Sequence, residues 1–344
     1  DQMTKMYIPG FVGITVLDSL ARLRALAWVI VLSQGYVAFE LNLSFLAGSN
    51  ILREQGFAGM DNNSAAIAFV TALGTSFFLG MHVRKSWQKA ICFGVAALLA
   101  HAILFSFSRG GMLAMIVAAS VGFFMMPKRP THYLAFAMAV MIGVSLAGAE
   151  VRDRLSTAFA EGEERDASAQ SRIDLWRDCW DVIQKNPLFG AGPDHWPLIA
   201  HHYGWPPGKE AHSLWVQNAA EIGLPGILLL IGFFTSTMRL LWPMCRERSD
   251  VPSPWFRDAA RMVVTSLVGF MLSSQFVSLE ALEIPYFVAL IGAGSLRLLS
   301  LPNLIESSEQ AAFVGDGDGE DDDADFEDEW GDDESADLAA PLTV

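Results

Sequence analysis

The chain has 344 residues, of which 52% are hydrophobic and 18% charged, and its formal net charge is −15. Sixteen acidic residues and no Lys or Arg follow Leu301, so residues 1–301 hold 22 acids and 23 bases. The acidity is therefore a property of the C-terminal tail. The remainder contains apolar runs long enough to cross the roughly 30 Å hydrocarbon core of a bilayer, which excludes a water-soluble domain.

Apolar runs separated by charged, Pro, Gly or Asn residues predict an all-α, polytopic membrane bundle. The chain begins with Asp1, and we interpret the run at residues 3–17 as the second half of a truncated spanning helix. A kink is expected at Pro225, inside one of the later spans. The further spans are predicted at residues 25–47, 64–82, 90–107, 110–126, 132–149, 218–241, 259–279 and 283–300.

Lys and Arg in the short connections predict the orientation, because such residues are retained in the cytoplasm. They gather in alternate connections and so fall on one side of the predicted bundle. The opposite side then contains residues 48–63 and 150–217, which are predicted to face outward, whereas the acidic tail faces the cytoplasm.

These features divide the chain into five regions. Residues 1–24 form a truncated membrane segment with a cytoplasmic turn, and residues 25–149 and 218–301 form transmembrane helices. Residues 150–217 form one large extracytoplasmic loop. Residues 302–344 form an acidic tail, for which dense like charge and low hydrophobicity predict disorder.

The loop contains one amphipathic helix, predicted over residues 171–187. Its apolar stripe consists of Ile173, Trp176, Trp180 and Ile183, which recur at intervals of 3, 4 and 3 residues. The acidic residues of this helix are interleaved with Lys and Arg. We therefore expect a solvated face of ion pairs there rather than a metal site.

Two arginines are candidates for holding an anionic group. Arg109 lies between two apolar runs with almost no spacer, where a charge normally faces a protein interior or a water-filled cavity. We favour an Arg109 side chain that faces such a cavity over one that extends to lipid phosphates. Gly110 and Gly111 beside it would let a backbone or a ligand approach closely. Arg172 opens the loop helix, and its spacing alone favours a surface ion pair over a ligand contact.

His212 stands at the mouth of a predicted span, with Glu221 further along the same segment. A neutral imidazole at this place is suited to take a proton from a hydroxyl nucleophile. A structural or capping role is equally compatible with the sequence. The four histidines of the loop match no common zinc pattern in their spacing.

In their order along the chain, these residues resemble the O-antigen ligase and O-antigen polymerase superfamily. The resemblance rests on SRGG at 108–111, on R-x3-W-x6-I-x3-P-x2-G-x-G over 172–192, and on H-S-x3-Q-x3-E-x-G-x2-G over 212–226. Order and topology match from about residue 60 to residue 235. One departure is Ser213, at a position where the family more often has Asn.

The resemblance implies a glycosyltransferase of the bacterial inner membrane with its long loop in the periplasm. Such an enzyme moves a glycan from an undecaprenyl-diphosphate carrier to an acceptor hydroxyl, without cofactor or metal. The implied partners are the carrier-linked glycan, a lipid or glycan acceptor and membrane lipids, with no nucleic acid. The implied catalytic residues are His212, Arg172 and Arg109, and the implied substrate-binding residues are Arg109, Arg172, Glu221 and Trp176.

Three alternatives remain open from the sequence. A polymerase of the same superfamily would use another glycan as acceptor, whereas a ligase would use a lipid A-core sugar. A secondary transporter of the bicarbonate type would require charges near the membrane midplane and broken helices in paired halves. A non-catalytic scaffold would use its acidic tail to recruit basic partners.

Overall fold

The structure of the chain is a computed structural model that describes residues 2–146, 167–279 and 282–301. Within these ranges the chain forms helices joined by turns, with one isolated bridge between Phe57 and Met60 and no strand. This confirms the predicted all-α fold. The predicted acidic tail and most of the first part of the predicted loop lie outside the described residues.

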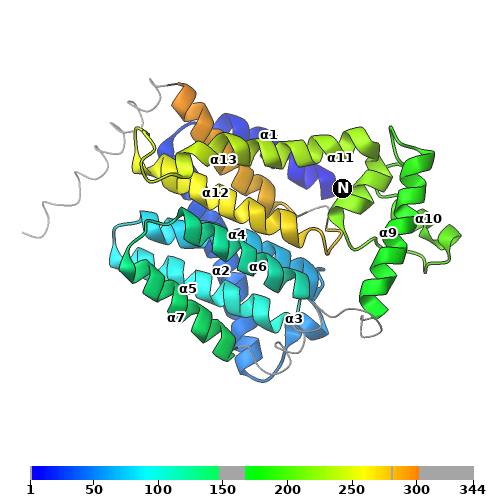
Figure 1. Cartoon of the computed structure of the whole chain (residues 1–344), viewed down its shortest axis with the longest axis horizontal. Helices are drawn as coiled ribbons and strands as arrows, with labels where there is room; N and C mark the ends of the chain where they lie inside the picture. The colour runs from blue at the N-terminus through cyan, green and yellow to red at the C-terminus, as the bar shows by residue number, and fades with distance from the viewer. Residues whose placement is uncertain (1, 147–166, 280–281, 302–344) are drawn as a thin grey trace, which may run out of the picture.

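Helices α4, α6, α11 and α12 run roughly along the long axis of the molecule, and α9 and α10 cover one end of it (Figure 1). Their bounds are α1 Gln2–Val16, α2 Leu20–Leu46, α3 Ile51–Glu54, α4 Asn62–His82, α5 Ser86–Phe105, α6 Arg109–Met125, α7 Pro130–Leu146, α9 Ala167–Lys185, α10 Trp196–Ile199, η2 Ala200–Tyr203, α11 Leu214–Leu241, η3 Trp242–Cys245, α12 Pro254–Ser273 and α13 Ile284–Ser300.

Every predicted span corresponds to one of these helices. Within the described ranges, four segments are able to cross a membrane by length and composition, namely α2, α4, α5 and α11 together with η3. The apolar helices α6 and α13 are shorter, and α12 carries three charged residues near its start. The chain is thus a polytopic all-α membrane protein.

Close contact between α4 and α12 forms the centre of the bundle. A Cβ atom at Gly74 of α4 would lie 2.8 Å from the backbone nitrogen of Ser266 in α12, and one at Gly269 would lie 2.5 Å from Val70. The Ser266 hydroxyl also accepts a hydrogen bond from the Thr75 backbone N–H at 3.0 Å. Membrane helices usually approach one another closely at small residues. Short polar side chains then form hydrogen bonds between the helices.

One end of the bundle, which we call the basic end, gathers the connections that are rich in Lys and Arg. There the C-terminus of α4 meets the start of α12, since His82 Nδ1 lies 3.0 Å from Asp258. The Arg24 guanidinium of α2 lies over the ring of Trp255, at 5.7 Å from its centroid. The basic end is on the left in Figure 1.

The opposite end, which we call the loop end, carries α3, α9 and α10 and appears on the right in Figure 1. The helices α4, α6 and α11 begin at this end. Asn62 at the start of α4 donates a side-chain hydrogen bond to the carbonyl of Ser106, just before α6. The backbone N–H of Leu214, at the start of α11, donates to the carbonyls of Ser274 and Val277 after α12.

Replacing Gly74 with Ala tests the contact between α4 and α12. The new methyl group would force α12 away, and overpacking of this kind costs about 1–3 kcal/mol. We expect a lower thermal unfolding temperature of the purified protein in detergent. Gly94→Ala in α5 is the matched control, because a Cβ atom there meets nothing within 4 Å. An equal effect of the two substitutions would contradict the close packing.

Candidate functional site

Three of the apolar helices that begin at the loop end are each capped by a short polar side chain. The caps are Asp61 for α4, Ser108 for α6 and Ser213 for α11, which accept from the backbone N–H groups of Ser64, Gly111 and Val216. A helix N-terminus carries a partial positive charge and favours anions. Each of these three N-termini therefore places a local partial positive charge at the loop end, next to the C-termini of α2, α5 and α12.

His212 lies in this region on a strained segment of backbone. Its φ is 53°, a left-handed value that non-glycine residues adopt rarely and that often marks a functional position. The next residue is fixed on the bundle, because the backbone N–H of Ser213 donates to the Ser278 hydroxyl at 3.1 Å. This hydrogen bond holds the half-buried His212 imidazole just before the start of α11.

The loop helix α9 holds the same segment from the other side. The indole N–H of Trp176 donates to the carbonyl of Ala211 at 2.9 Å, and the backbone N–H of Ala211 donates to Gln217 in α11 at 3.0 Å. Trp176 is thus tied to the residue just before His212. The sequence pattern contains both Trp176 and Gln217, but it does not indicate that they meet at one peptide group.

Charged side chains from three elements act on His212. The Lys209 ammonium lies 3.2 Å from His212 Nε2. Burial, Lys209 and Arg172 of α9 lower the pKa of His212, while the Asp61 carboxylate opposes them. The imidazole is therefore held in its neutral form at neutral pH.

Asp61 is a second ionised group of this cluster. Desolvation raises the pKa of Asp61, but hydrogen bonds from Ser64 and Asn63 outweigh it and lower the pKa. The structure thus brings Arg172, Asp61 and His212 together, although they lie far apart along the chain. Sequence reasoning passed over Lys209 entirely, since a single loop lysine gives no signal.

Arg109 is the first residue of α6 and is half-buried. The glycines after it serve helix packing: a Cβ atom at Gly110 would lie 2.6 Å from the ring of Phe276, and one at Gly111 would lie 2.7 Å from Ala66. Phe276 belongs to the connection after α12 that also supports Ser213. The start of α6 therefore packs against the same connection that positions His212.

Glu221 is 1% exposed and lies inside the junction between α11 and the loop. Its two carboxylate oxygens accept from the backbone N–H groups of Asp194 at 2.9 Å and Trp196 at 3.2 Å. Close by, α11 is broken at Gly223, whose φ is 73° and ψ 177°. The Glu221 side chain thus fixes the Gly-rich turn before α10.

The predicted kink in α11 is present, but its centre is Gly223 and not Pro225. A proline is tolerated in the first turn of a helix, where its missing N–H has no intrahelical partner. Pro225 thus lies in the first turn of the second half of α11. The break lets the Leu224 N–H donate to the carbonyl of Pro187 at 2.8 Å.

The apolar face of α9 differs from the predicted stripe. Ile183 is buried as expected, but Trp180 is 54% exposed. The helix is rotated so that Leu175, Cys179 and Val182 are buried against Trp196 and the start of α11 instead. Trp176 is only half-buried because its indole N–H reaches across to Ala211.

The acidic face of α9 forms ion pairs, as the sequence predicts. Asp174 pairs with Arg177 at 3.4 Å, and Asp181 pairs with Lys185 at 2.6 Å. These acids also anchor the end of the loop, because Asp181 accepts from the Tyr203 hydroxyl at 2.7 Å. Exposed pairs of this kind contribute little to stability.

Glu221→Gln tests the anchoring of the turn. An amide side chain has one acceptor oxygen, so at least one of the two buried backbone N–H groups loses its partner, which costs roughly 1.5–3 kcal/mol. We expect amide hydrogen exchange at Asp194 and Trp196, followed by mass spectrometry, to become about tenfold faster or more. Asp174→Asn, on the ion-paired surface of α9, should leave that exchange unchanged. Unaltered exchange in Glu221→Gln would contradict the anchoring role.

A comparison with protein-family models gives one match to this chain. The model described as O-antigen ligase matches residues 94–231, from α5 into the second half of α11. The matched segment contains Arg109, Arg172 and His212. A search of curated proteins gave no significant match. Residues 94–231 therefore form a domain of the O-antigen ligase superfamily, and this match supports a membrane glycosyltransferase of the ligase and polymerase type.

Proposed function

We propose that the chain transfers a glycan from an undecaprenyl-diphosphate carrier to an acceptor hydroxyl at the outer face of the inner membrane. The loop end then faces the periplasm and the basic end faces the cytoplasm. The observation that carries the proposal is the approach of the Arg172 charge to a neutral, strained His212 at the start of three capped helices. That arrangement combines positive charge for a diphosphate with a base for a hydroxyl.

On the donor side, Arg172 and Arg109 bind the diphosphate. A guanidinium matches phosphate oxygens in a bidentate fashion and stays charged at every relevant pH. The N-termini of α4, α6 and α11 add their partial positive charge. When the bond between the anomeric carbon and the phosphate oxygen breaks, this preorganised charge stabilises the leaving diphosphate without requiring a metal ion.

On the acceptor side, His212 Nε2 takes the proton of the attacking hydroxyl as the new glycosidic bond forms. In the structure Lys209 occupies this nitrogen, at 3.2 Å. The ammonium group keeps the imidazole neutral, and it leaves Nε2 open once the diphosphate attracts it. Glu221 and Trp176 then act as positioning residues, because both hold backbone groups next to the site.

Ligase and polymerase share this chemistry and differ in the acceptor. A lipid A-core sugar is the acceptor of a ligase, and the end of another glycan is that of a polymerase. We favour the ligase, because the matched family model carries that description. Complementation of two bacterial strains separates the two reactions, as follows.

Arg172→Ala should abolish glycan transfer by the protein, because it removes a charge from the diphosphate site. In a ligase-deficient strain the wild type is expected to restore capping of lipid A-core, resolved by gel. Arg177→Ala is the matched control, since Arg177 lies on the same helix, is exposed and pairs only with Asp174 among the ion pairs described above. A long-chain ladder restored in a polymerase-deficient strain would instead identify a polymerase. Solute uptake that does not depend on Arg172 would favour the transporter.

Lys209→Met should shift the pH dependence of transfer. A general base acts only when deprotonated, so kcat/KM falls as the pH drops through the pKa of His212. The charged groups around His212 are Lys209, Arg172 and Asp61, and the positive ones lower this pKa. Removing Lys209 raises the pKa, so the acid limb of the profile moves to higher pH.

Lys209→Arg is the control for this shift, because it retains the charge and should retain the position of the acid limb. Both enzymes are assayed for transfer in reconstituted vesicles with carrier-linked glycan and acceptor. If the acid limb of Lys209→Met coincides with that of the wild type, Lys209 does not act on the base.

A further inference from the structure

The basic end carries a large excess of positive charge. Among the described residues, thirteen Lys and Arg side chains and four acidic ones belong to the helix ends and connections there. The acids are Asp18, Glu247, Asp250 and Asp258. The bases are Arg22, Arg24, Arg84, Lys85, Lys89, Lys128, Arg129, Arg239, Arg246, Arg248, Arg257, Arg261 and Arg297.

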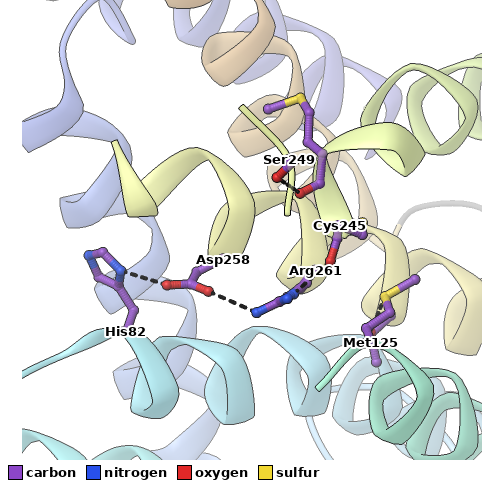
Figure 2. A network of polar contacts seen from close by, with 8 residues as sticks. His82, Met125, Cys245, Ser249, Asp258 and Arg261 are labelled. Atoms are coloured by element: carbon purple, nitrogen blue, oxygen red, sulfur yellow. Dashed lines mark hydrogen bonds and ion pairs between the residues drawn. The ribbon is translucent and has the colours of Figure 1, made fainter. Parts of the chain in front are cut away.

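Two of these acids, Asp18 and Asp258, are already engaged in ion pairs, and Figure 2 shows those of Asp258. One oxygen of Asp258 lies 3.0 Å from His82 Nδ1 and the other lies 3.4 Å from Arg261 Nη1. Arg261 also donates from Nε to the carbonyl of Cys245 at 3.0 Å, and its buried Nη2 has no hydrogen-bond partner. The internal acid thus leaves part of the buried positive charge without compensation.

Most of the other bases lie on the surface of this end. Asp18 forms an ion pair with Arg22 at 2.7 Å. The connections after α4, α6 and η3 contribute exposed side chains, among them Arg84, Lys128 and Arg246. A surface of one sign with so few counter-charges attracts a polyanion over distances set by ionic strength.

The chain itself supplies a polyanion that starts at the basic end. Helix α13 ends at Ser300, and Arg297 in its last turn donates to the carbonyl of Ile14 at the end of α1. The 43 residues that follow Leu301 contain 16 acids and no Lys or Arg. Because these residues are covalently linked to α13, their effective concentration at the basic end is roughly millimolar.

We propose that residues 302–344 dock on the basic end of the same chain and neutralise it. Anionic lipid headgroups are the chief competitor, since they are attracted to the same bases. The tether favours the tail over them, because lipids must be recruited from the surrounding membrane. Docking is independent of the transfer reaction, so its test needs no substrate.

The test is zero-length cross-linking of the full chain, placed as a single copy in phosphatidylcholine nanodiscs. A water-soluble carbodiimide joins a carboxylate to a Lys amine only when the two are in contact, and mass spectrometry identifies the joined peptides. We expect tail peptides joined to Lys85, Lys89 and Lys128. Raising the salt concentration from about 0.05 to 0.5 M should reduce their yield roughly fivefold or more, because screening shortens the range of the attraction.

Lys185 and Lys209 provide an internal control, since they lie at the loop end of the same chain. An Arg246→Gln, Arg248→Gln double variant should lower the yield at all three basic-end lysines, whereas Arg177→Gln should not. Equal joining to lysines at both ends would overturn the proposal. So would a complete loss of the tail products in discs that contain phosphatidylglycerol at physiological salt, because lipid would then be the occupant. Products formed only between two chains would also overturn it.

Discussion

The break in α11 at Gly223 connects the loop to the membrane bundle, and the geometry of the site depends on it. Because the helix is interrupted there, the Ala220 and Glu221 carbonyls are open to the N–H groups of Ala191 and Gly192. The Gly-rich turn fits against them only without side chains, since a Cβ atom at Gly190 would lie 2.4 Å from the Glu221 backbone. With the turn fixed, α9 is held in place and carries Arg172 and Trp176 to the start of α11. The charge that acts on His212 thus depends on a backbone junction.

The two ends of the bundle differ in electrostatic character. At the loop end, the positive charge that acts on His212 comes from Arg172 and Lys209 and is local, which suits one compact anion. At the basic end, side chains dominate, and the charge is spread over many connections. A single diphosphate fits the first environment, whereas an extended polyanion fits the second. On our two proposals, the same bundle would bind two kinds of anion without sharing residues between them.

The sequence predicted the helices well, because a membrane requires long apolar runs whatever their partners. The family motifs also placed Arg109, Arg172 and His212 in one candidate site. Such patterns cannot predict contacts made by single polar groups. Nothing in the sequence around Ser278, for example, indicates that its hydroxyl accepts a hydrogen bond from Ser213. The rotation of α9 was predicted wrongly at Trp180, because the stripe was chosen by hydrophobicity alone. The structure instead buries the small Cys179 where the helix approaches the bundle, and this face depends on tertiary packing.

The junction at Gly223 also bears on the order in which the chain assembles. The bonds from Glu221 to the turn join positions 25 and 27 residues apart, whereas the bond between Thr75 and Ser266 joins positions 191 apart. Contacts of short sequence separation form early, because little chain entropy is lost in closing them. The loop and the first part of α11 are then able to associate during synthesis, before α12 exists. The late step is the insertion of α12 against α4, which completes a support for His212 that the loop alone cannot provide.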